Sequence, residues 1–295
     1  MQEIAKEIFY LGTVGKPATT AIYAIYDGEE CTIIEPGPNS GAAMIVKWLS
    51  DAGIEQRKVK RIIATHIHLD HAGASAALLK AYPDSRLIVY KGAAKHLIDP
   101  SQLISSASSI LGPFFEIWGG MPAVDAGRIV ETGDNANIES NGKSLSIIYT
   151  PGHAAYHMSI WEANARVLFT GDAVGMYTKQ RDTLWPASPL PSFRLDMEMN
   201  TLQKISQLDA KVLAIPHYAP VYNAKEFFDL NIDIYQKWHS ILSSLKGEKD
   251  TELVASKLAD AIDSYSWVKN DSMTWLTFKM HVAGFLNYES SHASF

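Results

Sequence analysis

The stretch from residue 64 to residue 73 constrains this chain more than any other. It reads ATHIHLDHAG, so three of the ten histidines and an aspartate fall within a few positions. Residues 59–64 predict a buried strand and residues 72–82 predict a helix. Imidazoles and a carboxylate gathered where a strand gives way to a helix are typical of a metal site, and they suit zinc, iron or manganese.

The spacing within this stretch predicts two groups of ligands. His66 and His68 are two residues apart, so in extended chain they point to the same side and can bind one ion. Asp70 and His71 lie where the chain turns into the helix, from which they can reach a second ion. The alternative is a solvated polar turn. It is disfavoured because neighbouring imidazoles without a metal leave donors and acceptors to satisfy.

Length and composition narrow the function classes. A chain of 295 residues allows one large domain or a domain with an appendage. The net charge of −6 gives no sign of a general nucleic-acid binder. No apolar run approaches the roughly 20 residues that span a bilayer, and residues 1–9 show no signal-peptide core. The single cysteine, Cys31, excludes an intramolecular disulfide. We therefore expect a cytoplasmic protein that does not associate with a membrane.

Strands and helices alternate over the first three quarters of the chain. Strands are predicted at residues 8–11, 20–26, 31–34, 59–64, 86–90, 128–131, 145–149, 158–161, 166–170 and 211–215. Helices are predicted at residues 42–52, 72–82, 91–98 and 196–208. This order predicts a layered α/β fold.

Four of the predicted strands end at histidine or aspartate. The first is the strand that leads to His66. The other three lead to His153, in Thr150-Pro151-Gly152-His153, to Asp172, which follows Gly171, and to His217, which follows Pro216. Ligands bind outside the carboxyl ends of strands in layered α/β folds, so we expect these side chains to converge.

Two segments remain outside this pattern. Residues 101–124 are long and low in charge, and predict a helix packed on the core with a loop after it, an apolar wall or lid over a binding cleft, or both. Residues 225–245, 251–261 and 272–288 predict helices. We expect an α/β domain at residues 1–222 and a helical extension at residues 223–295 that either shapes the substrate pocket or forms a contact in a homodimer.

The four motifs, taken in order, resemble the ligand set of the metallo-β-lactamase superfamily over roughly residues 6–220. The resemblance implies a four-layer αββα sandwich with the metals in a cleft at one edge. It also implies a dinuclear site in which each member of the set has a role: His66, His68 and His153 bind one ion, Asp70, His71 and His217 bind the other, and Asp172 bridges them. His157 and Glu35 fall where relatives carry supporting residues.

This resemblance implies a dinuclear, metal-dependent hydrolase. Two divalent cations, zinc first, with iron or manganese also fitting the donor set, lower the pKa of a bound water to about 7. The resulting hydroxide attacks a carbonyl carbon or a phosphorus. Asp70 is expected to orient the nucleophile or carry a proton. The expected partner is a small-molecule substrate, and the bond expected to be cleaved is a thioester, a lactone or a related ester.

Within the superfamily the chain resembles the glyoxalase II-like branch, which hydrolyses a glutathione thioester. Lys269 and Lys279 are the candidate glutathione contacts, and Pro216 stands where that branch usually has glycine. Lactone hydrolysis is the close competitor, for which Tyr177 or Tyr218 would assist at the carbonyl.

Other activities remain as alternatives. A mononuclear iron persulfide dioxygenase has the same fold. A metal-dependent ribonuclease or phosphodiesterase is a further alternative; a ribonuclease would need a basic track, and none stands out in the sequence. A β-lactamase would carry a secretion signal and lack the Asp70 ligand. A non-catalytic binding protein would be expected to have lost ligands.

Overall fold

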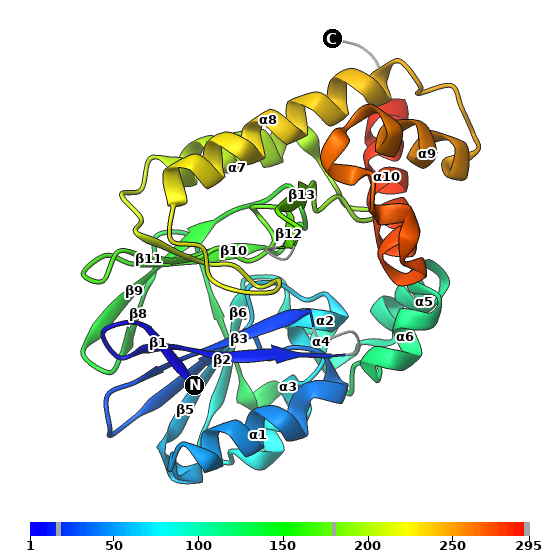
Figure 1. Cartoon of the computed structure of the whole chain (residues 1–295). Coiled ribbons are helices and arrows are strands. Elements are labelled where there is room, and N and C mark those ends of the chain that lie inside the picture. The colour runs from blue at the N-terminus through cyan, green and yellow to red at the C-terminus, as the bar shows by residue number, and fades with distance from the viewer. Residues whose placement is uncertain (16–18, 179–180, 292–295) are drawn as a thin grey trace. The chain divides into compact units, whose positions relative to one another are not determined.

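The computed structural model describes residues 1–15, 19–178 and 181–291 (Figure 1). It divides into two compact units, which are described separately. The first comprises residues 1–149, 156–171 and 209–224, and the second comprises residues 150–155, 172–208 and 225–295. These units interleave along the chain, and the predicted domain boundary at residue 222 stays a prediction.

The first unit contains a seven-stranded sheet among its described residues, in the order β1-β2-β3-β4-β5-β6-β7. Its strands are β1 (Gln2–Ala5), β2 (Ile8–Val14), β3 (Thr20–Tyr26), β4 (Cys31–Ile34), β5 (Val59–Ile63), β6 (Arg86–Tyr90) and β7 (Ile129–Thr132). The first four pair antiparallel, whereas β4 to β7 pair parallel. Parallel strand β5 therefore lies inside the sheet and delivers the histidine-rich stretch at its carboxyl end.

The second sheet of this unit has five strands among the described residues, in the order β14-β11-β10-β9-β8. They are β8 (Asn137–Ser140), β9 (Lys143–Tyr149), β10 (Met158–Glu162), β11 (Val167–Phe169) and β14 (Val212–Ala214). The β11–β14 pair is parallel and the others are antiparallel. These bounds confirm the strands predicted in this region.

A buried apolar core lies between the two sheets. It joins Tyr23 and Ile63 of the first sheet with Ile160 and Phe169 of the second. The rings of Tyr23 and Phe169 meet edge to face with their centroids 5.8 Å apart. Strands buried on both faces have continuous apolar runs, which is why the sequence predicted them clearly.

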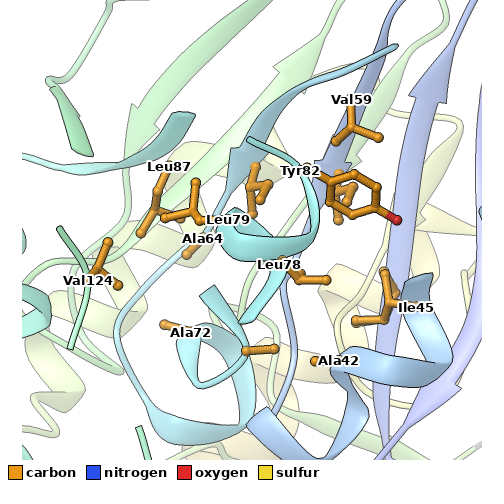
Figure 2. Packing of buried hydrophobic residues seen from close by; sticks show 14 of the residues in the cluster. Ala42, Ile45, Val59, Ala64, Ala72, Leu78, Leu79, Tyr82, Leu87 and Val124 are labelled. Carbon is orange, nitrogen blue, oxygen red and sulfur yellow. The ribbon is translucent and has the colours of Figure 1, made fainter. Parts of the chain in front are cut away.

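Helices pack on the other face of the first sheet. The helical segments of this unit are η1 (Asn39–Gly41), α1 (Ala42–Asp51), η2 (Gln56–Lys58), α2 (Leu69–Ala72), α3 (Ser75–Ala81), α4 (Ala94–Ile98), α5 (Ser101–Leu111), α6 (Pro113–Trp118) and η3 (Ala126–Arg128). Ile45 and Leu49 are four residues apart and share the buried face of α1. Figure 2 shows Ile45 together with Leu78 and Leu79 of α3 in this core.

The low-charge segment at residues 101–124 forms two helices, α5 and α6, followed by an irregular stretch. Leu103, Ala107, Phe115 and Trp118 pack against the core of the first unit. This confirms the prediction that the segment packs on the core. A role as a lid stays a prediction.

The second unit is mainly helical. It contains β12 (Met176–Thr178), β13 (Thr183–Trp185), α7 (Leu195–Ser206), α8 (Ala224–Ser243, apart from its first residue), α9 (Thr251–Ala261), η4 (Asp263–Tyr265), η5 (Val268–Asn270) and α10 (Ser272–Ser291). Trp238 packs edge to face on Phe278, with ring centroids 5.4 Å apart. Asp250 caps α9 by accepting the backbone N–H groups of Glu252 and Leu253.

The predicted α/β class with stacked sheets is confirmed, and so are the predicted C-terminal helices. The antiparallel pair β12–β13 was not predicted. Across residues 1–15, 19–178 and 181–291, no helix is both long and apolar enough to cross a bilayer.

Candidate metal centre

The histidine-rich stretch follows β5 and enters α2, whose N-terminal cap is His68. The Nε2 atom of His66 lies 3.0 Å from Nδ1 of His68. The two rings are nearly perpendicular, with centroids 4.6 Å apart. The prediction that these side chains face the same side is therefore confirmed.

A second group in the same unit consists of Asp70, His71 and His217. Each offers a ligand atom, and these atoms all lie within 4.8 Å of one another. His71 and His217 are buried. Their rings are nearly perpendicular, with centroids 5.2 Å apart. Three donors at this separation can hold one cation, as the sequence predicted for these residues.

His217 reaches this group because its segment is bound to the first sheet. The chain leaves β14 of the second sheet, and the carbonyl oxygen of Pro216 then accepts the N–H of Ala21 in β3 at 2.7 Å. His217 itself forms an isolated bridge with Thr20. The edge where both sheets end thus carries donors from distant parts of the sequence.

Glu35 lies beneath this cluster in a left-handed backbone conformation, with φ of 64°. Its side chain is 2% exposed. Oε1 accepts the hydroxyl of Thr65 at 2.6 Å, and Oε2 lies 3.3 Å from Nδ1 of His71. These contacts agree with the supporting role that the resemblance implied.

Two further residues fix the surroundings of the cluster. Gly37 donates its N–H to the carbonyl of His71 at 2.8 Å, and its carbonyl accepts the N–H of Ala74 at 2.9 Å. His157 is fully buried, and its ring centroid lies 5.0 Å from that of His66. Side chains that pack on metal ligands orient them, so His157 fits the expected supporting role.

The second unit carries the remaining predicted ligands, His153 and Asp172. Nε2 of His153 lies 3.3 Å from Oδ2 of Asp172, and both side chains are buried. Nδ1 of His153 lies 2.8 Å from the carbonyl oxygen of Ala187. A carbonyl can only accept, so Nδ1 carries the proton and Nε2 presents a lone pair.

Glu198 and Tyr235 were missed by sequence reasoning. The hydroxyl of Tyr235 donates to Oε1 of Glu198 at 3.4 Å, and the carboxyl of Glu198 accepts the backbone N–H of His153. Complete burial raises the pKa of Glu198 well above its ordinary value, and the charge of Asp172 adds to this. Burial likewise raises the pKa of Tyr235. The available signal was an acid in the apolar stripe of α7, in register with Leu202.

The two tyrosines proposed to assist at a carbonyl have different settings. Tyr177, in β12, donates its hydroxyl to Oδ1 of Asp182 at 2.9 Å. Burial and this aspartate raise the pKa of Tyr177 to about 12. Tyr218 directly follows His217 and has a φ of 72°, and its carbonyl accepts the hydroxyl of Tyr10. The catalytic roles of Tyr177 and Tyr218 stay predictions.

The two lysines expected to contact glutathione are engaged with acids. Nζ of Lys269 lies 2.7 Å from Oδ1 of Asp260, and Nζ of Lys279 lies 2.6 Å from Oε2 of Glu252. Both ammonium groups also lie over the ring of Trp275. Their charge is compensated locally, and their role as glutathione contacts stays a prediction.

The donor chemistry fits the implied metals. Histidine nitrogens and aspartate oxygens are ligands of zinc, iron and manganese, and Cys31 is buried in β4, outside this donor set. The first unit holds His66, His68, Asp70, His71 and His217, and the second holds His153 and Asp172. That the full set acts together stays a prediction from the sequence.

The comparisons identify the family. The family model of the metallo-beta-lactamase superfamily matches residues 15–217, which is more than half of the chain and includes every predicted ligand. The chain belongs to the metallo-β-lactamase superfamily. Its fold is the metallo-β-lactamase fold, as the sequence resemblance implied, and its class is that of the metal-binding hydrolases of this superfamily.

Two relatives illustrate the match. The metallo-beta-lactamase fold-containing protein ST1585 of Sulfurisphaera tokodaii is 29% identical over 238 residues, covering 76% of this chain and 86% of ST1585. Its solved structure superposes with a TM-score of 0.65, covering 78% of this chain and 85% of that one. A hydroxyacylglutathione hydrolase of Cupriavidus taiwanensis is 28% identical over 72% of this chain and 64% of its own length.

A further solved structure shares the fold over nearly the whole chain. The metallo-beta-lactamase family protein TTHA1429 of Thermus thermophilus superposes with a TM-score of 0.72 at 19% identity. The match covers 99% of this chain and 95% of that one. At this identity it speaks for the fold alone, including the helical C-terminal region.

Proposed function

We propose that this chain is a dinuclear metal-dependent hydrolase that cleaves a thioester, lactone or related ester of a small molecule. The observation that carries the proposal is the cluster of Asp70, His71 and His217, whose ligand atoms lie within 4.8 Å of one another. These are the donors assigned to the second ion. A mononuclear iron persulfide dioxygenase would not need them, so the cluster favours the hydrolase.

We assign His66, His68 and His153 to the first ion and Asp172 to a bridging position. The superfamily match spans all of these residues. The proton on Nδ1 of His153 leaves Nε2 as the nitrogen that can bind a metal. Zinc is the first choice for this donor set, with iron or manganese as alternatives.

Bound metals would supply Lewis acidity and would bring the pKa of a water to about 7. Residues of the chain then orient the water and donate a hydrogen bond to the carbonyl of the substrate. Asp70, partly exposed at the start of α2, accepts a hydrogen bond from the attacking water and orients it. Tyr177 and Tyr218 are the proposed donors to the carbonyl oxygen. With a pKa of about 12, Tyr177 keeps its proton throughout the neutral range.

The choice of bond rests on the relatives and on the electrostatics of the second unit. Hydroxyacylglutathione hydrolases are among the relatives, which supports an acyl substrate. The paired states of Lys269 and Lys279 argue against glutathione held by these side chains. We therefore propose the acyl class without the glutathione moiety. A small-molecule substrate, a cytoplasmic location and a homodimer remain proposals from the sequence.

A hydrolysis screen with bound metal measured in parallel tests the proposal. Thioesters, lactones, phosphodiesters and β-lactams should be offered to the protein purified without added metal. We expect turnover of thioesters or lactones that chelation abolishes and zinc restores. Turnover of phosphodiesters alone, or oxygen consumption with one iron per chain, would contradict it.

A further inference from the structure

Residues 187 and 188 of the second unit connect His153 to two distant helices. The carbonyl of Ala187 accepts Nδ1–H of His153 at 2.8 Å. The backbone N–H of Ala187 donates to the hydroxyl of Tyr235 in α8 at 3.1 Å. The N–H of Ser188 donates to Nδ1 of His281 in α10 at 3.0 Å. All of these side chains are buried.

The connection through α8 closes on His153. From Tyr235 the chain of hydrogen bonds continues to Oε1 of Glu198 in α7. The carboxyl of Glu198 accepts the backbone N–H of His153. The main chain of His153 therefore bonds Glu198 directly, and its ring is linked to Tyr235 through residue 187. Gly152 leaves room for this carboxyl, because a Cβ there would clash with Oε2 of Glu198.

The connection through α10 joins residue 188 to the backbone of the helix. The hydroxyl of Ser188 donates to the carbonyl of His281 at 2.8 Å. A Cβ on Gly284 would clash with the carbonyl oxygen of Ser188. Only glycine allows α10 to approach this closely, so the position of residue 188 is set by the helix.

We infer that Glu198 and Tyr235, together with the face of α10 at His281 and Gly284, are positioning residues that fix the ring orientation and tautomer of His153. The inference rests on the proposed function, in which His153 binds a metal ion. It gives the C-terminal helices a part in the metal centre that differs from a substrate wall or a dimer contact.

The physical reason is the geometry of histidine ligation. A metal-binding imidazole donates its other N–H to a carbonyl or carboxylate, which sets the tautomer and raises the basicity of the ligating nitrogen. Here that acceptor is Ala187, which belongs to no described helix or strand. Its placement depends on the hydrogen bonds to α8 and on the neighbouring contact with α10.

Tyr235→Phe tests the inference, with Tyr265→Phe as the matched control. Tyr265 is equally buried in the same unit and also loses a hydrogen bond, to the carbonyl of Leu184. Zinc affinity is measured by competition with a chromogenic chelator, and ligand geometry by the visible spectrum of the cobalt-substituted protein. We expect Tyr235→Phe to weaken binding of one ion about 10–100-fold and to shift the spectrum.

Two further variants, Tyr265→Phe and His153→Ala, distinguish failure of this inference from failure of the proposed function. Tyr265→Phe should lower stability comparably while zinc affinity stays within about threefold of the parent, well short of the effect of losing a supporting residue. His153→Ala should lose one ion. If it binds metal like the parent, the proposed function fails. If His153→Ala loses an ion but Tyr235→Phe matches Tyr265→Phe, the inference alone is overturned.

Ser188→Ala provides a second route should Tyr235→Phe not fold. It removes the hydrogen bond to the carbonyl of His281 with little change in volume. We expect zinc affinity to fall several-fold with the same spectral shift. Unchanged affinity and spectrum in this variant would overturn the part assigned to α10.

Discussion

The Oε2 atom of Glu35 lies 3.3 Å from Nδ1 of His71. On its other side, Nε2 of His71 lies 3.4 Å from Oδ2 of Asp70. Nδ1 of the His71 ring therefore faces the buried carboxylate of Glu35, and Nε2 faces the predicted ligand Asp70. A carboxylate at Nδ1 favours the tautomer that leaves Nε2 available to a metal ion.

Glu35→Gln should disturb this tautomer while preserving shape. The amide can turn its NH₂ group toward Nδ1 of His71, which favours a proton on Nε2 and blocks ligation. We expect affinity for one metal ion to fall by about tenfold or more, measured by chelator competition. Glu162→Gln is the control, because Glu162 is buried in the same unit and its carboxylate accepts the backbone N–H of Ala165. Equal metal affinity in both variants would contradict the role of Glu35.

His68→Ala should remove metal and activity but leave the fold. The side chain is outside both apolar cores of the first unit, so unfolding free energy should change little. Loss of a ligand should lower kcat/KM at least about 100-fold, since the Lewis acid supplies several kcal/mol. Bound metal, circular dichroism and turnover are the measurements. His96→Ala, which alters a histidine beside Tyr156, should keep both metal and activity. Full turnover by His68→Ala would show that the ligand assignment is wrong.

Gly284→Ala should destabilise the protein although alanine favours helices. The added Cβ would clash with the carbonyl oxygen of Ser188, and backbone cannot move aside cheaply. We expect a loss of about 1–3 kcal/mol in unfolding free energy, the usual cost of overpacking. Gly247→Ala is the control: among the described residues, its chain neighbours apart, no atom lies within 4 Å of a Cβ placed there. This variant should change stability by less than about 0.5 kcal/mol. Equal unfolding free energies of the two variants, measured by denaturant unfolding, would contradict the close contact between Gly284 and Ser188.

Cys31 should be unreactive in the folded protein. It is fully buried in β4, and burial raises the pKa of its thiol to about 12. Thiol reagents should label it only after denaturation. Because the folded pKa exceeds the ordinary 9.0, the unfolded chain ionises first as the pH rises. The contribution of Cys31 to stability is thus complete below a pH of about 9 and is lost toward a pH of about 12. Cys31→Ala should flatten this decline, and rapid labelling of the native protein would contradict the burial.

The sequence predicted the strands that deliver ligands because strands buried on both faces are continuous apolar runs. Residues 167–169 before Asp172 and residues 212–214 before His217 are examples. The pair β12–β13 was missed for a different reason. Each strand has three residues with a threonine at one end, so neither forms an apolar run in the sequence. The segment at residues 101–124 became two helices because Gly112 precedes Pro113, which begins α6.

The ligands were predictable because metal-binding residue types recur at strand ends, whereas their supports were not. Ala187 contacts His153 through a backbone carbonyl, which any residue could supply. Glu198 and Tyr235 lie on helices separated from His153 in sequence, and only tertiary packing brings them to it. The contact of Glu35 depends on a left-handed backbone that few non-glycine residues adopt.

Metal analysis of the protein purified without added metal tests the dinuclear centre most directly. The proposed ligand set predicts about two divalent ions per chain, mainly zinc, falling to about one in His217→Ala. A chain that takes up no cation when offered zinc, iron and manganese would contradict it, as would a single iron retained unchanged in His217→Ala.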